Sequence, residues 1–204
     1  MTAVPLADMA ISDRLNQLAA DAQESSVTLE WVLGQLHERA FGLFLLILAL
    51  PCCIPFLYGI PQVVALPLMF VSAQILIGRR VPWLPSRLAQ RSVASTELQS
   101  LAQRSGPWLR RIEAVSRPRL GLLTRAPMDK VVGAALVLFS ASILMPLPGT
   151  NTVPGIAVVA IAMGLLQRDG ILVLLGGILG AAWIATLLIA GATLASIIKT
   201  WLGF

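Results

Sequence analysis

The residues best suited to chemistry lie in a polar break between two short apolar runs, "MPLPGTNTVPG" at 145–155. Thr150, Asn151 and Thr152 supply hydrogen-bonding groups, and Pro154 suits the first turn of a following helix. A helix N-terminus carries about +0.5 charge and free N–H groups, which attract anions and phosphates. The pattern predicts an anion or phosphate-headgroup site. The alternative is that these side chains only cap the helix and satisfy the turn.

A second break, "IPFLYGIPQ" at 54–62, interrupts an earlier apolar segment. Pro61 again suits the first turn of a helix, and Tyr58 and Gln62 add polar groups beside it. We predict that Tyr58 and Gln62 face the three polar residues of the other break across one shared ligand site.

Other kinds of chemistry find little support in the residues. His37 is the only histidine, and the only two cysteines, Cys52 and Cys53, are adjacent, which suits neither a metal site nor an ordinary disulfide. No apolar run contains a carboxylate, and no hydrolase, metalloprotease or phosphate-loop motif is present. The isolated polar residues of the apolar runs, such as Gln74 and Ser140, are expected to bond to backbone or neighbouring helices. We therefore expect a protein that is not an enzyme, with no catalytic residue, metal or cofactor.

The composition is that of an integral membrane protein. Of the 204 residues, 57% are hydrophobic and 12% are charged, against roughly 25% charged in an average soluble protein. The mean hydropathy is +0.83. Residues 171–198 form an uncharged run, and at ~1.5 Å per residue its 28 residues exceed the ~30 Å hydrocarbon core of a bilayer.

The charges are distributed unevenly along the chain. Residues 1–40 carry a net charge of −4 and residues 79–130 a net charge of +8. A basic segment between apolar runs is expected to stay in the cytoplasm, so it needs no nucleic-acid partner. At its start, Arg79 and Arg80 can snorkel and Trp83 can lie among lipid headgroups, which predicts a membrane interface.

The two apolar blocks resemble copies of one unit. Residues 41–56 align with 132–147, which places Gly42 on Gly133, and 71–80 align with 161–170. We therefore divide the chain into five parts. They are an N-terminal arm and helix (1–40), membrane repeat 1 (41–78), a basic cytoplasmic spacer with short amphipathic helices (79–130), membrane repeat 2 (131–170) and a C-terminal transmembrane helix (171–204).

Within the N-terminal part, Thr28 is a good N-cap for a helix. We expect that helix to continue into the apolar segment 41–50 and to end near Pro51.

Two geometries fit the interrupted repeats, because unpaired backbone is tolerated at membrane depth only inside protein or beside water. Each repeat is either a re-entrant hairpin that returns to the same side, or one broken helix that crosses once. Hairpins are favoured, because no export signal is visible for the acidic N-terminus. The expected fold is all-α: a polytopic helical membrane protein with two Pro/Gly-interrupted helical hairpins and a C-terminal transmembrane helix.

Four stretches together resemble the ExoD family of bacterial inner-membrane proteins, associated with exopolysaccharide synthesis. They are "ERAFGLFLLILALP" (38–51), "AQILIGRRVPWLP" (73–85), "RRIEAVSRPRL" (110–120) and "PLPGTNTVPGIAVVAIAMGLLQRDG" (146–170). The resemblance implies a multi-pass protein of the bacterial inner membrane with a role in exopolysaccharide production. It implies no catalytic residues.

Combined with the interrupted helices, this leaves two main functions open. One is a carrier or flippase for an anionic or lipid-linked solute, such as a lipid-linked saccharide. The other is a non-catalytic accessory or scaffold subunit of a polysaccharide synthesis or export complex. The expected partners are membrane lipids and that solute, with a homodimer or a polysaccharide synthesis complex as candidate assemblies.

Overall fold

The computed structural model of the chain describes residues 26–55, 57, 59–94, 100, 103, 107, 120, 128–145 and 150–202. Residues 1–25 of the predicted N-terminal part, and most of the predicted spacer helices, lie outside the described residues. The described part is mostly helical, as the composition predicts.

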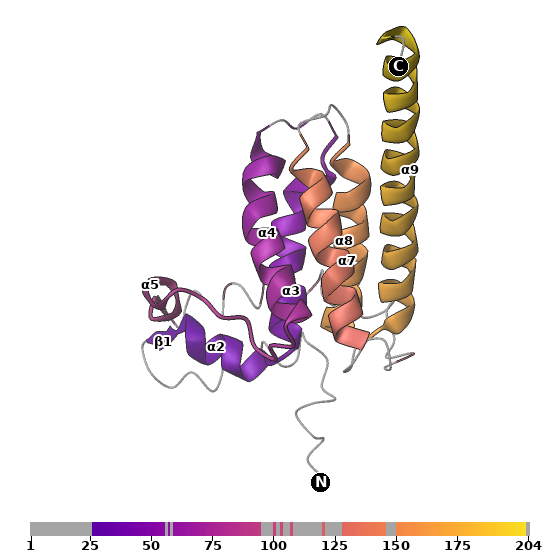
Figure 1. Cartoon of the computed structure of the whole chain (residues 1–204). Coiled ribbons are helices and arrows are strands. Elements are labelled where there is room, and N and C mark those ends of the chain that lie inside the picture. Colours follow the sequence, from indigo (N-terminus) through magenta and orange to yellow (C-terminus); the bar gives the residue numbers. More distant parts are fainter. Residues whose placement is uncertain are drawn as a thin grey trace.

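Four helices of similar length form a bundle (Figure 1). They are α3 (Arg39–Ala49) with its 3-10 extension η1 (Leu50–Cys53), α4 (Ile60–Leu76), α7 (Met128–Ile143) and α8 (Thr152–Gln167). Helix α3 packs against α4 and α8, while α7 packs against α4 and α8. The interior is apolar and closed, since Leu45, Leu68 and Leu136 have no exposed surface.

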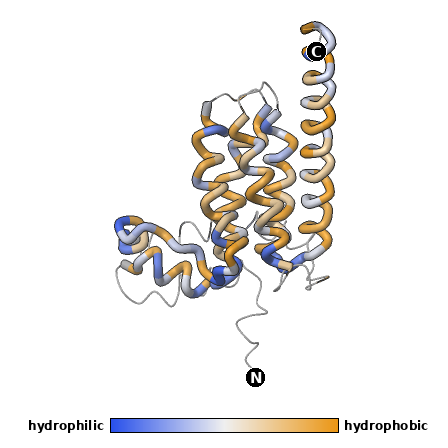
Figure 2. The backbone as a smooth tube through the Cα atoms, in the orientation of Figure 1, coloured by the Kyte–Doolittle hydropathy of each residue, from blue (hydrophilic) through white to orange (hydrophobic). Residues whose placement is uncertain are grey.

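The bundle has two distinct ends. We call the end where α4 and α8 finish, at Leu76 and Gln167, the base. The opposite end, where η1 and α7 finish and α4 and α8 begin, is the tip (Figure 1). Figure 2 shows hydrophobic residues along the bundle, with hydrophilic residues mainly at and beside the base and a few at the tip.

Helix α9 (Gly170–Leu202) starts at the base, runs beside α8 and continues well past the tip (Figure 1). All of its buried residues lie in its first third: Gly170, Val173, Gly176 and Gly180. It is the one helix among the described residues that is long and apolar enough to cross a membrane alone. Helix α2 (Leu29–Leu36) and residues Arg39–Cys53 form a bent pair, which is long and apolar enough to cross a membrane only if the two parts together make one span. These candidates indicate membrane association.

Two glycines allow the hairpins to approach each other closely. A Cβ on Gly42 of α3 would lie 2.7 Å from the backbone nitrogen of Leu166 in α8. A Cβ on Gly133 of α7 would collide with the backbone nitrogen of Leu76 in α4. The sequence alignment of the two blocks pairs Gly42 with Gly133 and Leu76 with Leu166. The two contacts therefore join positions that the sequence alignment pairs.

A small unit beside the base comes from segments far apart in the sequence (Figure 1). Strand β1 (Ser26–Thr28) pairs antiparallel with β2 (Ser92–Ala94), and Val27 is opposite Val93. Helix α2 follows β1, and the short α5 (Ser86–Ala89) precedes β2. The predicted cap is confirmed, because the Trp31 backbone N–H donates to Oγ1 of Thr28 over 3.3 Å. The strand pair was not predicted.

The predicted continuous helix from Thr28 to Pro51 is wrong. Helix α2 ends at Leu36, His37 adopts a positive φ of 51°, and α3 begins at Arg39 with its axis turned by 115°. The reason is that the two helices bury their apolar faces in different places. Helix α2 packs Val32 and Leu33 against the segment after α4, whereas α3 enters the bundle.

Candidate functional site

Helices α4 and α8 both begin at the tip of the bundle (Figure 1). In each hairpin the first helix, α3 or α7, runs toward the tip, and the second helix, α4 or α8, returns from it. The second break contacts the end of η1, which directly precedes the first break. A Cβ on Gly155, in the first turn of α8, would lie 2.9 Å from the carbonyl carbon of Cys52 in η1. Pro61 and Pro154 both occupy first turns, as predicted.

Asn151 is the most unusual of the predicted site residues. It precedes α8 and is 5% exposed, yet its side chain makes no capping hydrogen bond. Its Oδ1 is buried and has no hydrogen-bond partner among the residues that the structure describes. Leaving a buried polar group unpaired costs roughly 1–3 kcal/mol. An amide held in this state is available to a ligand that can reach it.

The two threonines that flank Asn151 lie at the start of α8. Thr152 is the first residue of α8, and Thr150 and Thr152 are both half-buried. The Asn151 carbonyl accepts from the Gly155 N–H over 2.9 Å, which starts the helical hydrogen-bond pattern.

The first break is built differently. Gly59 has a φ of +81°, and its backbone N–H donates to Oε1 of Gln62 over 2.9 Å. Gln62 therefore closes the start of α4, which is the capping role that the sequence left open as an alternative. Tyr58 lies outside the described residues. The predicted pairing of Gln62 and Tyr58 with the second break stays a prediction.

The predicted interface residues follow α4 at the base. Arg79 and Arg80 are exposed, and Trp83 is half exposed with its ring edge-on to Phe70 at 6.0 Å between centroids. Gln74, 4% exposed, holds this loop in place. Its Oε1 accepts from the Trp83 N–H at 2.6 Å and its Nε2 donates to the Trp83 carbonyl at 3.2 Å.

The expectation that isolated polar residues of the apolar runs bond to backbone is confirmed. Gln74 bonds to the main chain of Trp83, and the buried serines Ser72 and Ser140 donate to the carbonyls of Leu68 and Leu136 in the preceding turn. Both cysteines are free thiols. Within the described ranges no group of three or more His, Cys, Asp or Glu side chains is placed to hold a metal ion.

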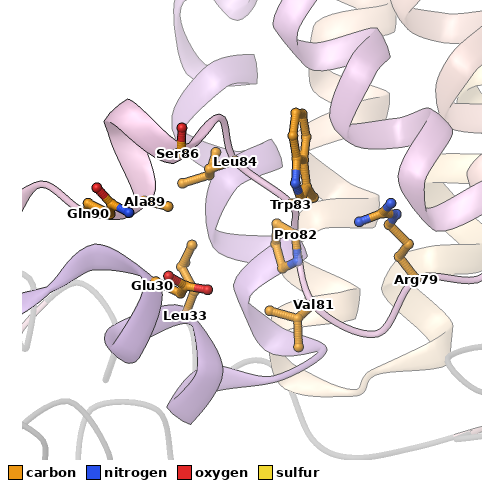
Figure 3. A pocket seen from close by; sticks show the side chains of 10 residues that line it. All are labelled: Glu30, Leu33, Arg79, Val81, Pro82, Trp83, Leu84, Ser86, Ala89 and Gln90. Atoms are coloured by element: carbon orange, nitrogen blue, oxygen red, sulfur yellow. The ribbon is translucent and has the colours of Figure 1, made fainter.

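Sequence reasoning missed a cavity of about 540 Å³ beside the base. It lies between α2, the loop at 79–84 and α5 (Figure 3). Its lining includes Glu30 and Leu33 from α2, and Arg79 and Trp83 from the loop. The only sequence signal was the predicted interface stretch at 79–85, because the opposite wall comes from a helix about fifty positions earlier.

Comparison with known proteins agrees with the sequence pattern. A protein-family model described as "Exopolysaccharide synthesis, ExoD" matches residues 11–189. The chain is 30% identical over 186 residues to an uncharacterised protein of Synechocystis sp., covering 87% of this chain and 88% of that protein. It is also 30% identical over 168 residues to Protein ExoD of Rhizobium meliloti, covering 80% of this chain and 70% of that protein. No solved structure matches. The chain therefore belongs to the ExoD family, which is associated with exopolysaccharide synthesis.

Proposed function

We propose that this chain is a multi-pass, non-enzymatic protein of the bacterial inner membrane that carries or flips an anionic or lipid-linked solute in exopolysaccharide production. The observation that supports the proposal most is at the tip. Two helices, α4 and α8, begin at this end of the bundle, and the buried amide of Asn151 has an Oδ1 with no partner among the described residues. Helix N-termini favour anions, and half-helices serve this purpose in many transporters.

The lengths of the helices support re-entrant hairpins. Helix α8 has 16 residues and spans ~24 Å, less than the ~30 Å hydrocarbon core, whereas the 33 residues of α9 span ~50 Å. Charged residues lie at the base, including Arg79, Lys130 and Asp169, and the apolar remainder of α9 continues beyond the tip. With the base at the cytoplasmic interface, the tip lies within the bilayer and α9 crosses it. A helix that crosses once and unwinds fits less well, since α3 and α4 are neighbours in a hairpin.

The internal repeat is part of this proposal. A two-fold relation between hairpins exchanges α3 with α7 and α4 with α8, so the α3–α8 contact becomes the α7–α4 contact. The Gly42–Leu166 and Gly133–Leu76 contacts follow this rule. Such a relation brings the two breaks together and gives one binding site from two halves.

The test is complementation of exopolysaccharide output with Asn151 variants, together with their melting temperatures. Asn151→Ala should impair output while leaving the melting temperature nearly unchanged, because Asn151 makes no capping bond. One hydrogen bond to a charged ligand is worth roughly 1.5–3 kcal/mol, or about ten- to a hundredfold in affinity. Asn151→Asp should impair output further, since a carboxylate repels an anion.

The opposite pattern contradicts a ligand site at the tip. If both variants support full output and only their melting temperatures fall, the break is structural. If, in addition, replacing arginines of the basic spacer abolishes output, the accessory or scaffold function in a polysaccharide synthesis complex is correct instead.

A further inference from the structure

We propose that the cavity beside the base binds a zwitterionic phospholipid of the phosphatidylethanolamine type. This site is distinct from the tip, because α2 and α5 lie at the other end of the bundle from the two breaks (Figure 1). At about 540 Å³ the cavity is within the usual range for small-molecule sites, roughly 300–1,000 Å³.

The charges of the cavity select the class of ligand. Arg79 lines the loop wall and Glu30 the α2 wall, with Pro82 and Trp83 between them in the close view (Figure 3). Neither charged side chain has an ion-pair partner within the described part of the chain. A guanidinium is well suited to a phosphate, and a carboxylate is suited to an ammonium group. A ligand with only a negative charge would bring that charge toward Glu30, whereas a phosphate joined to an amine offers each residue a group of opposite charge.

The surface next to the cavity is suited to an acyl chain. Trp83 contacts Phe70 of α4 (49% exposed), and the same face carries further exposed apolar side chains: Val63 (69%) and Leu66 (56%) in α4 and Ile77 (68%) directly after it. Their spacing of three, seven and fourteen residues from Val63 places them on one side of the helix. A lipid with its headgroup in the cavity can lay a chain along this strip. Trp and Arg commonly occupy the headgroup level of a bilayer.

The walls of the cavity are fixed before any ligand arrives. Gln74 clamps the main chain of Trp83 through two hydrogen bonds. The β1–β2 pair and the bond from the Leu29 N–H to the Arg91 carbonyl, 3.1 Å long, join α2 to the segment after α5. A preformed site loses less conformational freedom on binding, which favours affinity.

The proposal can be tested with the purified full-length chain in detergent. Phosphatidylethanolamine or phosphatidylglycerol is titrated, and bound lipid is measured by native mass spectrometry and by the shift in melting temperature. The wild-type chain should prefer phosphatidylethanolamine. Arg79→Gln should weaken binding of both lipids about tenfold or more, because it removes a charge-assisted contact to phosphate. Glu30→Gln should weaken only phosphatidylethanolamine and so abolish the preference.

Arg87→Gln is the matched control, since Arg87 is an exposed arginine of α5 that does not line the cavity. It should bind both lipids like the wild type. Equal binding of the two lipids to the wild type overturns the proposal, as does unchanged binding in the Arg79 and Glu30 variants. Glycerophosphoethanolamine, the headgroup without acyl chains, should bind much more weakly. If it binds as tightly as the lipid, the apolar strip has no role and the assignment to a membrane lipid is wrong.

Discussion

Asn151 and Gln62 are both amide side chains at the start of a helix, but their surroundings differ. The backbone of Asn151 is already helical, with φ −83° and ψ −26°, and its side chain makes no cap bond. A capping side chain normally comes from an extended residue, whose oxygen then reaches the N–H groups of the next turn. Gln62 reaches back to the N–H of Gly59 instead. The sequence predicts polar groups at both breaks, but it does not predict these backbone angles and therefore cannot separate the two roles.

Gln62→Ala should lower the free energy of unfolding by about 1 kcal/mol, the usual effect of removing a helix cap. The reason is that the Gly59 N–H loses its acceptor. Gln62→Glu is the matched control, because it keeps an acceptor oxygen and places a negative charge in the first turn, where the helix dipole favours it. Thermal unfolding in detergent measures both. A Gln62→Ala protein as stable as the wild type would exclude the capping role.

At the scale of helices, the sequence predicts individual helices from local patterns, but it does not predict contacts between distant segments. The hydrophobic runs and breaks predict α4, α8 and α9 nearly to their ends. The bend at His37 was missed because the apolar pattern runs through it without a glycine or proline. The β1–β2 pair and the cavity beside it join segments about sixty positions apart, and no local signal specifies that contact.

The close approach of the hairpins gives a prediction for two glycines. Gly42→Ala and Gly133→Ala should each destabilise the protein by roughly 1–3 kcal/mol, the usual effect of overpacking. The new methyl group would collide with the backbone of the facing helix rather than with a flexible side chain. Similar losses at both sites are expected if the hairpins are equivalent.

Gly177→Ala is the control for the glycine pair. It lies inside α9 with nothing within 4 Å of the added Cβ, so it should be neutral or stabilising by up to about 1 kcal/mol through helix propensity. Melting temperatures of the three variants test whether the two close contacts are overpacked to a similar extent. A loss at only one of Gly42 and Gly133 would contradict the two-fold relation.

On the scale of the whole molecule, the proposed membrane orientation follows from where the charges and the long helix lie. The base carries charged residues, the breaks lie at the tip, and α9 extends past the tip to Lys199 near its end. If both hairpins return to the side they entered from, then the N-terminal arm, the spacer and the turn before α9 share the cytoplasmic side. Only the end of α9 reaches the other side. The net charge of +8 on residues 79–130 favours the same orientation.

Single cysteines introduced into a chain lacking Cys52 and Cys53 test this orientation. In intact cells an impermeant thiol reagent should leave Ser12→Cys and Ser100→Cys unlabelled and should label Thr200→Cys near the end of α9. Permeabilised cells provide the control, since all three positions should then react. Labelling of Ser100→Cys from outside would reverse the topology. Labelling of Ser12→Cys from outside, with Ser100→Cys protected, would mean that the first repeat crosses the membrane once as a broken helix, and the paired N-termini at the tip would then need another explanation.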